Sequence, residues 1–422
     1  MSSSKIRVLI AAENASTRFG GEAIIPHHYF RLLRARGVDA HLIVHARTRD
    51  ELTQTFRTDL EHLHFVEDQL LQKLFFRIGK LLPHRIAEAT FGLANQLLTQ
   101  RAQRGIIRRL ATPTTVLHQP IPVSPRFPSL LYDLGVPVVI GPLNGGMDYP
   151  PAFRDAESGL SQFLIAIGRS FTDSFNALFP GKGRASVILI ANERTREALP
   201  SHITGRVLEL PENAVDTTQW KSSDAPVQDP TRFVFIGRLV DWKALDIVIE
   251  ALRDVPAATL DIIGDGPMLP SWQALAQTLG LASRIRFLGW RSQAQCAESL
   301  AESCALILPS LYECGGAVVL EAMAMRRPVI ATAWGGPADY LDATCGILVE
   351  PTSRAALVFG FANAMRRLID SPNLCAQLGE AGRQRLEQNF EWNRKIDQIL
   401  EIYSSCRPQH PGGPSQSQSH RD

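Results

Sequence analysis

Residues 305–333, ALILPSLYECGGAVVLEAMAMRRPVIATA, contain the pattern that decides the fold. A run of apolar residues is followed by a loop with two adjacent glycines, a helical run and a second apolar run. Neither apolar run alternates with polar residues, which is typical of strands that are buried on both faces of a parallel sheet. The stretch therefore predicts a strand–helix–strand unit of an α/β protein.

Similar apolar runs recur before this stretch and alternate with longer helical patterns. They lie at 5–12 (KIRVLIAA), 39–46 (DAHLIVHA), 114–119 (TTVLHQ), 137–142 (PVVIGP), 232–239 (RFVFIGRL), 259–266 (TLDIIGDG) and 284–290 (RIRFLGW). A passage rich in Pro and Asp, 211–231, separates the first four runs from the rest. We therefore predict two doubly wound, Rossmann-like domains that face each other across a cleft.

The chain is divided at this passage. The predicted parts are an amino-terminal domain on the acceptor side (1–210), a linker (211–231), a carboxyl-terminal domain (232–390) and a disordered tail (404–422). An amphipathic helical segment at 389–403 lies between the second domain and the tail. Because parallel sheets bind ligands at the carboxyl ends of their strands, we expect the functional residues in the loops that follow the apolar runs.

Composition limits the classes of protein that the chain can represent. Its 422 residues suit two domains, and 45% hydrophobic with 20% charged residues is the balance of a globular protein. The net charge of +2 argues against a nucleic-acid partner. Six scattered cysteines without metal-binding spacing predict reduced thiols, no metal site and a cytoplasmic location. The first apolar run is too short for a signal peptide, and none is long enough to cross a bilayer.

Two cations follow the strand predicted at 232–237. Arg238 comes directly after it, and Lys243 lies in the same loop. Fixed positive groups in a cleft suit a diphosphate, because they stabilise the negative charge that a nucleoside diphosphate gains as it leaves a sugar. Taken alone, the two residues could equally be exposed residues of a strand-to-helix turn.

Two carboxylates and two glycines follow the strand at 305–310. Gly315 and Gly316 would let the backbone amides at the start of the next helix approach an anion. Glu313 precedes them, and Glu321 lies about one and a half turns into the helix. Carboxylates accept hydrogen bonds from hydroxyl groups, so Glu313 suits a sugar ring and Glu321 a ribose. The pair could also be a general acid and base, or arise by chance.

The amino-terminal half contributes a second glycine loop. Gly20 and Gly21 follow the first apolar run and precede an amphipathic helix, as an anion-binding loop would. The pattern G-x-G-x-x-G is absent there, which argues against a dehydrogenase. His118 and residues 144–146 end two further runs and would face the cleft. A lone histidine is usually structural, but its place at the end of a strand keeps both interpretations open for His118.

In combination these motifs resemble the retaining GT-B glycosyltransferases of family four, which carry an E-x7-E motif. The resemblance extends over nearly the whole chain and includes GRLVDWKALD, GDGP, PSLYECGGAVVLEAMA, RPVIAT and GILV. It implies two overlapping sets of residues. The catalytic set is His118, Arg238, Lys243 and Glu313, and the donor-binding set is Gly20, Gly21, Arg238, Lys243, Gly315, Gly316 and Glu321. It also implies that the helix at 391–403 crosses back onto the first domain.

The resemblance further implies the chemistry. A nucleotide-diphosphate sugar would donate its sugar to a hydroxyl of a glycan or lipid-linked acceptor in surface polysaccharide synthesis, with front-face attack and retention of configuration. Neither a metal nor another cofactor would be needed. Three residues depart from the family's pattern and leave the sugar open: Cys314 and Gly316 in place of Gly-Phe-Gly, and Arg326 in place of a frequent glycine.

Residues 69–109 are strongly basic, with eight Lys or Arg and one acidic residue. Mixed with Leu, Phe and Ile, these charges suit peripheral contact with the anionic inner face of a membrane. A pair of helices that close the first domain with solvated basic faces is an equal alternative.

Three other functions remain open at this point. A GT-B nucleotide-sugar epimerase or a sugar phosphorylase would use a similar cleft, and a non-catalytic protein could merely bind a nucleotide sugar. We see no lysine pattern that would hold a phosphorylase cofactor. The four charged residues at 238, 243, 313 and 321 favour transfer over binding alone.

Overall fold

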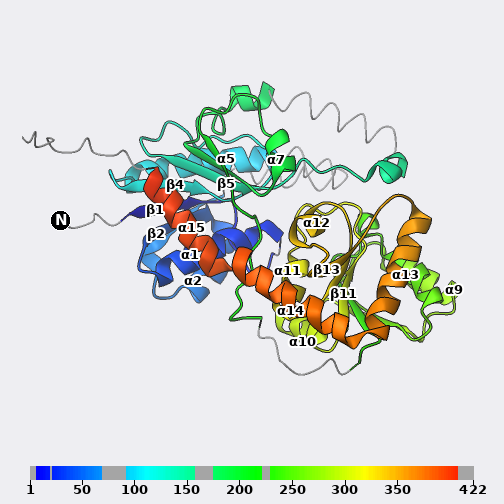
Figure 1. Ribbon diagram of the computed structural model, residues 1–422. Helices are drawn as coiled ribbons and strands as arrows, with labels where there is room; N and C mark the ends of the chain where they lie inside the picture. Colours follow the sequence, from blue (N-terminus) through cyan, green and yellow to red (C-terminus); the bar gives the residue numbers. More distant parts are fainter. Residues whose placement is uncertain (1–5, 20, 69–91, 157–173, 221–228, 407–422) are drawn as a thin grey trace, which may run out of the picture.

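The chain forms two α/β domains, each built on a parallel sheet with helices on both faces (Figure 1). The computed structural model describes residues 6–19, 21–68, 92–156, 174–220 and 229–406. All nine apolar runs named above form strands, as predicted. Four further strands, β3, β6, β7 and β13, were not predicted from those runs.

The first sheet has seven parallel strands. In spatial order they are β3 (Leu63–Val66), β2 (Asp39–His45), β1 (Arg7–Ala11), β4 (Thr115–Gln119), β5 (Val138–Leu143), β6 (Val187–Ile190) and β7 (Arg206–Glu209). Alternate residues of one strand enter two different cores: Val8 and Ile10 pack on one face of the sheet, and Leu9 and Ala11 on the other. Burial on both faces is the reason why these strands are continuously apolar.

Helices cover both faces of this sheet. The described helices of the first domain are η1 (Gly21–Ala23), α1 (Ile24–Ala35), η2 (Ala46–Thr48), α2 (Arg49–Thr55), η3 (Leu60–His62), α5 (Leu93–Leu110), η5 (Pro151–Ala156) and α7 (Glu193–Glu197). Helix α1 packs on one face, and α5 packs on the other through the buried Ile107. The basic stretch 69–109 is described only from residue 92 onward.

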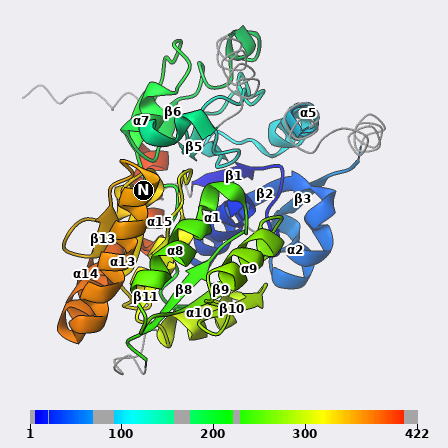
Figure 2. The ribbon, with the colours of Figure 1, turned by 90° about the vertical axis from the view of Figure 1, so that its right-hand side faces the viewer.

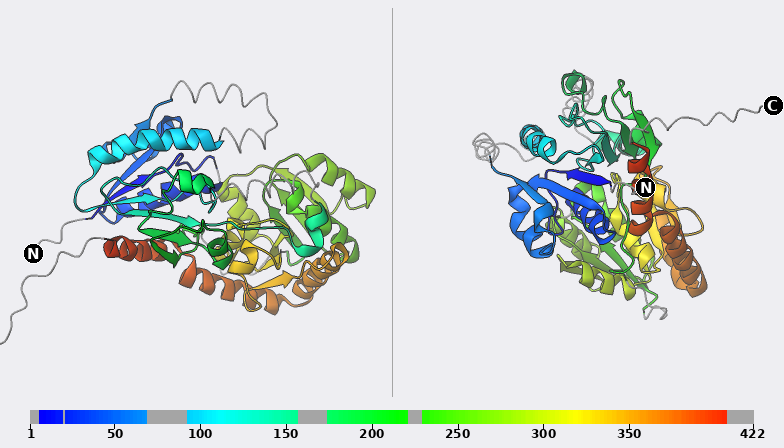
Figure 3. Two further views of the ribbon diagram at one scale, coloured as in Figure 1. Left: turned by 90° about the horizontal axis from the view of Figure 1, so that it is seen from above. Right: turned by 90° about the vertical axis from the view of Figure 1, so that its left-hand side faces the viewer.

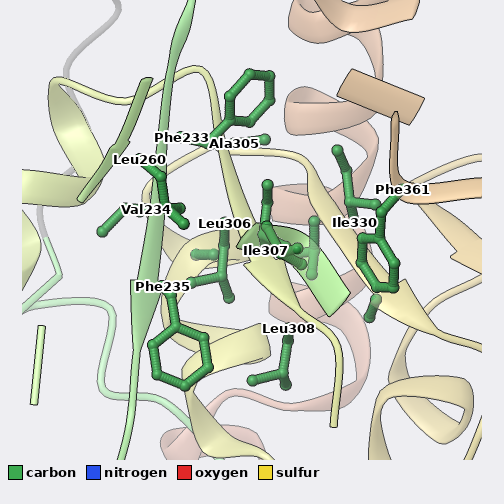
Figure 4. Close-up of a cluster of buried hydrophobic side chains, with 14 of the residues drawn as sticks. Phe233, Val234, Phe235, Leu260, Ala305, Leu306, Ile307, Leu308, Ile330 and Phe361 are labelled. Atoms are coloured by element: carbon green, nitrogen blue, oxygen red, sulfur yellow. The ribbon is translucent and has the colours of Figure 1, made fainter. Parts of the chain in front are cut away.

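The second sheet has six parallel strands. In spatial order they are β10 (Ile285–Gly289), β9 (Thr259–Ile263), β8 (Arg232–Ile236), β11 (Ala305–Leu308), β12 (Val329–Thr332) and β13 (Gly346–Val349). Its central strands β8 and β11 pack against Leu260, Ile330 and Phe361 in one apolar core (Figure 4). The stretch quoted first in the sequence forms β11, the helix after it and β12, at the centre of this sheet.

The helices of the second domain lie in sequence between its strands and after them. They are η6 (Asp241–Lys243), α8 (Leu245–Ala251), η7 (Leu252–Asp254), α9 (Leu269–Thr278), α10 (Gln293–Ala301), α11 (Ala317–Ala324), α12 (Gly336–Tyr340), α13 (Arg354–Asp370) and α14 (Pro372–Asn389). Figure 2 shows α8 and α9 side by side, and the two helices are in contact.

The last described helix, α15 (Trp392–Ser405), leaves the second domain and packs on α1 of the first (Figures 1 and 3). Its apolar side chains at 392, 396, 399 and 403 are buried in the core of the first domain. One predicted boundary needs correction. Residues 404 and 405 belong to this helix and not to the tail, because the last turn of α15 continues past the buried Tyr403. Residues 407–422 lie outside the described part.

The passage predicted as a linker is not a loose connection in its first half. Val215 and Trp220 are buried in the core of the second domain. The backbone of Val215 also pairs with Glu391, just before α15. The two chain segments that pass between the domains therefore lie side by side and support each other.

Candidate active site between the domains

A cleft of about 840 Å³ lies between the two domains. Its first wall comes from the glycine loop before α1 and from the loops after β4 and β5, and its second wall from the loops after β8, β10 and β11. All these loops follow the carboxyl ends of parallel strands, where such sheets place their ligand sites. Residues 212 and 213 of the passage between the domains complete the lining.

Polar contacts join the two walls at one side of the cleft. Arg194 of α7 pairs with both oxygens of Asp339 in α12, at 3.1 and 2.7 Å. Asn192 donates to the same carboxylate at 2.9 Å. Nearby, the indole of Trp334 donates to the carbonyl of Asp148 at 2.8 Å. These bonds fix the separation of the walls, so the cleft has a defined width.

Lys243 and Glu313 form a direct ion pair inside the cleft. The Nζ of Lys243 donates to Oε2 of Glu313, which Ser310 also approaches at 3.5 Å. Both charged side chains are largely buried, with 14% and 15% exposure. Lys243 ends η6, where the next residue, Ala244, adopts a left-handed conformation with φ of 48°. This tight turn aims the lysine into the cleft instead of along the surface.

The other predicted cation lies differently. Arg238 is exposed and is not among the residues that line the cleft, whereas its neighbour Gly237 is. Lys243, Glu313 and Glu321 thus line one cleft, whereas the side chain of Arg238 does not reach it in this structure. The reason is geometric: successive residues of the extended segment after β8 point in opposite directions. Within the described ranges, no acidic side chain pairs with Arg238.

The loop after β11 delivers a helix start to the cleft, as the glycine pair predicted. Gly316 caps α11 with a left-handed φ of 77°. Gly315 packs so closely against Asn213 that a Cβ on Gly315 would lie 2.4 Å from the side-chain amide nitrogen of Asn213. Ala317 and Val318, the first residues of α11, also line the cleft. Free backbone amides at a helix start attract anions, and these face the same space as Lys243.

Glu321 reaches the cleft from the fifth position of α11. Burial raises the pKa of this carboxyl to about 7. Within the described residues it has no hydrogen-bond partner, in contrast to Glu313. A carboxyl in this position can accept a hydrogen bond from water in the cleft or from a donor group of a ligand.

The amino-terminal wall centres on the loop before α1. Gly21 lines the cleft with φ of 55°, whereas Gly20 lies outside the described residues. Next to it, the side chain of Glu22 accepts the backbone N–H of Val123 at 3.0 Å. Burial raises the pKa of Glu22. This bond ties the glycine loop to the loop after β4, so the wall is a single unit.

Sequence reasoning missed Glu212, which is the most deeply buried carboxyl of the cleft lining. It lies between the domains and accepts a hydrogen bond from the amide of Asn144 at 2.6 Å. Burial raises its pKa to about 7. Asn144 also donates to the carbonyl of Cys314, at 3.0 Å. Nothing in the sequence indicated a role for Glu212, because the passage around it resembled a linker.

Trp290 is a second lining residue that the sequence did not single out. It follows β10 and is 79% exposed at the rim of the cleft. An exposed indole beside an anion-binding loop offers a flat surface to an aromatic ring. The neighbouring Arg291 lines the same region.

The structure does not place His118 in the cleft. The ring is fully buried in β4, with Nε2 2.7 Å from the carbonyl oxygen of Gly141 and Nδ1 2.6 Å from the hydroxyl of Tyr403. Burial lowers its pKa to about 4. The expectation that His118 faces the cleft is therefore wrong, because strand alternation turns the side chain into the core between the sheet and α15.

Comparison with known protein families identifies the domain that forms the second wall of the cleft. Residues 216–385 match the family described as glycosyl transferases group 1. This part of the chain is a glycosyl transferases group 1 domain. The domain includes Lys243, Glu313 and Glu321, whereas the glycine loop of the other wall lies outside the match.

Curated relatives are also glycosyltransferases by name. The lipopolysaccharide core biosynthesis glycosyltransferase LpsE of Rhizobium meliloti is 30% identical over 203 residues, which are 48% of this chain and 55% of LpsE. The alpha-D-kanosaminyltransferase of Streptomyces kanamyceticus is 27% identical over 242 residues, 52% and 60% of the two chains. The chain thus matches little more than half the length of these relatives.

Solved structures share the fold over almost the full length. Anabaena HepE, solved in complex with UDP, superposes with a TM-score of 0.64 and 16% identity, covering 95% of this chain and 100% of HepE. WaaG, a glycosyltransferase involved in lipopolysaccharide biosynthesis, gives 0.62 and 17%, with 94% and 99% covered. The group 1 glycosyltransferase domain therefore belongs to a complete GT-B fold. No helix in the described ranges is both long and apolar enough for a membrane span.

Proposed function

We propose that the chain is a retaining, metal-independent hexosyltransferase that moves a sugar from a nucleotide-diphosphate donor to a hydroxyl acceptor. One observation carries the proposal. Lys243, the start of α11 and Glu321 face one cleft between the domains of a GT-B fold that contains a group 1 glycosyltransferase domain. A cation, free amides and an unpartnered carboxyl match a diphosphate and a ribose in adjacent positions.

In this proposal the donor phosphates bind between Lys243 and the amides of α11. The negative charge that develops on the departing diphosphate is stabilised by these groups, which are already in place. Glu313 holds hydroxyls of the transferred sugar, and Glu321 holds the ribose. The base stacks on Trp290. Arg238 becomes a second phosphate contact when its side chain turns from solvent toward Gly237.

The acceptor enters from the amino-terminal wall, past Gly21 and Glu22. Its hydroxyl attacks the anomeric carbon on the face that the diphosphate leaves, while the leaving phosphate oxygen takes the hydroxyl proton. The new bond then has the configuration of the old one. The products are the glycosylated acceptor and the nucleoside diphosphate anion, which has taken the hydroxyl proton. No metal is needed because Lys243 supplies the positive charge.

We also propose the setting. LpsE and WaaG are named for lipopolysaccharide synthesis, which supports a glycan or lipid-linked acceptor in surface polysaccharide synthesis at the inner face of a membrane. Within the described part of the basic segment 69–109, Arg101, Arg108 and Arg109 of α5 are exposed and available to anionic lipid. Arg104 is not, because it donates to two backbone carbonyls.

The test is a panel of nucleotide sugars. A true donor should raise Tm by mass action, and the protein should then transfer labelled sugar to an acceptor extract without added Mg²⁺ or Mn²⁺. NMR of the product should show the anomeric configuration of the donor. An inverted product would contradict retention, and dependence on added metal would contradict the charge assigned to Lys243. An altered nucleotide sugar without an acceptor would indicate epimerisation.

A further inference from the structure

A second cluster of polar side chains lies at the opposite edge of the first sheet from the cleft. Asp39 and His41 are the first and third residues of β2, and His62 and His64 lie where β3 begins. Because all strands of this sheet are parallel, these positions are at the amino ends, away from the loops that line the cleft. The transferase proposal uses none of them.

Three potential metal ligands converge in this cluster. Nε2 of His41 is 3.1 Å from Oδ1 of Asp39, and Nε2 of His62 is 3.7 Å from the same oxygen. The ligand atoms of the three residues all lie within 4.8 Å of one another. Ligands of a tetrahedral Zn²⁺ are separated by about 3.3 Å, given bonds of about 2.0–2.1 Å. Small side-chain movements would complete that geometry.

The contacts of His41 allow two tautomers. Nδ1 of His41 is 3.1 Å from Nε2 of His64, and the buried Nε2 of His41 is 3.1 Å from Oδ1 of Asp39 without forming a regular hydrogen bond. In one tautomer His64 donates to Nδ1, and the Nε2–H of His41 faces the Asp39 carboxylate. In the other, Nδ1 donates to His64, and Nε2 presents a lone pair that can bind a cation together with the carboxylate.

Two of the three residues have the outer contacts that metal ligands usually have. The other oxygen of Asp39 accepts a hydrogen bond from Nε of Arg7 at 2.7 Å. His64 holds the ring of His41, whereas Nδ1 of His62 is buried without a hydrogen-bond partner among the described residues, 3.7 Å from Glu61. A metal-binding histidine usually has such a partner for its second nitrogen, because the partner fixes the tautomer and the ring orientation.

We propose that Asp39, His41 and His62 bind a Zn²⁺ ion, with His64 and Arg7 as outer partners. Imidazole and carboxylate together favour Zn²⁺ over Mg²⁺ or Ca²⁺, which prefer oxygen ligands only. Asp39 is partly exposed, so water can take the fourth position. The ion would tie β2 to the edge strand β3, at a distance from the reaction.

The test uses the full chain without a histidine tag, freed of metal with a chelator. After addition of ZnCl₂ and gel filtration, elemental analysis should find one zinc per chain, and Tm should rise by roughly 5 °C. His62→Gln, at the sheet edge, should lose both the zinc and the rise while keeping the native circular dichroism. His64→Gln should weaken binding about 10- to 100-fold, as loss of an outer partner does.

His202→Gln is the matched control, because His202 is exposed and lies outside the cluster. It should bind zinc as the wild type does. The proposal is overturned if the wild type retains no zinc, or if His62→Gln retains as much as the wild type. Either outcome would mean that these residues form a hydrogen-bonded histidine cluster and not a zinc site. Neither outcome affects the transferase proposal, because the tests measure zinc and Tm, not sugar transfer.

Discussion

At the scale of single residues, the cleft is defined by how its charges are paired. Lys243 and Glu313 neutralise each other, whereas Glu321 has no partner among the described residues. A donor that enters the cleft must break this ion pair, so that Lys243 contacts its phosphates and Glu313 contacts its sugar hydroxyls. Before the donor binds, the ion pair therefore holds both side chains in place in the cleft.

Replacing Lys243 by Ala should lower turnover about 100-fold or more, since it removes a fixed positive charge that faces the leaving group. Initial rates with a saturating nucleotide sugar measure the effect. Arg253→Ala, an exposed cation of the same domain, should leave the rate unchanged. Near-normal turnover in a folded Lys243→Ala protein would refute the assigned role.

Glu212 should make stability depend on pH. Its pKa is about 7 in the folded protein, above the ordinary 4.5, so the folded state binds the proton more tightly than the unfolded state does. The free energy of unfolding should therefore fall as pH rises from about 4.5 to 7, by on the order of 3 kcal/mol from this group. Glu212→Gln should flatten that slope in urea unfolding measured across the range. Equal slopes in both proteins would contradict the buried, neutral carboxyl.

Residue types and spacing sufficed to predict Glu313, Glu321 and the glycines of the α11 loop. They did not suffice for His118 and Arg238, because the direction of a side chain after a strand depends on register that the sequence does not display. The structure explains why a glycine is frequent in the family at the position of Arg326. Its φ is 55°, a left-handed conformation that a glycine adopts without strain.

At the scale of elements, the glycines around α11 and α12 allow two loops to pack together. Gly335 has φ of 65°, and a Cβ there would lie 2.3 Å from the methyl carbon of Met147 and 2.4 Å from the carbonyl oxygen of Glu313. That same carbonyl accepts the N–H of Gly336 at 2.8 Å. The Glu313 loop is thus held from behind by α12.

Gly335→Ala should destabilise the protein by about 2–4 kcal/mol and slow transfer, because the added methyl pushes the Glu313 loop forward. Gly280→Ala is a matched control: its φ is 69°, but nothing lies within 4 Å of the added carbon. That variant should lose only about 1 kcal/mol. Denaturant unfolding and initial rates measure both. Equal losses would show that backbone strain alone matters at position 335.

Strands with a continuous apolar run were predictable from the sequence, and strands with a short or charged sequence were not. The nine apolar runs became strands because they are buried on both faces. β7 was missed because it is at the sheet edge, where its four residues are partly or fully exposed and two of them are charged. The residues of the zinc proposal, D-A-H and H-L-H, lie at the start of β2 and around the start of β3, and only the pairing of these two strands brings them together.

At the scale of the whole molecule, the domains are joined by α15, by the passage around Val215 and by the contacts of Asp339. Asp339→Ala removes three hydrogen bonds between α7 and α12. Backbone amides of α7 and α12 should then exchange with deuterium faster, while those of α13 should not change. Asp370→Ala, exposed at the end of α13, serves as the control. Unchanged exchange in α7 would mean that α15 and the passage around Val215 fix the domains without the contacts of Asp339.

Helix α15 has a consequence for biosynthesis. Trp392 and Tyr403 fill the core of a domain whose other parts precede residue 221. A nascent chain elongates at about 5–20 residues per second, so roughly 10–40 s pass between the emergence of residue 220 and that of α15. During that interval the part of α1 that α15 covers faces water. The growing polypeptide therefore presents a binding site to ribosome-associated chaperones until α15 arrives.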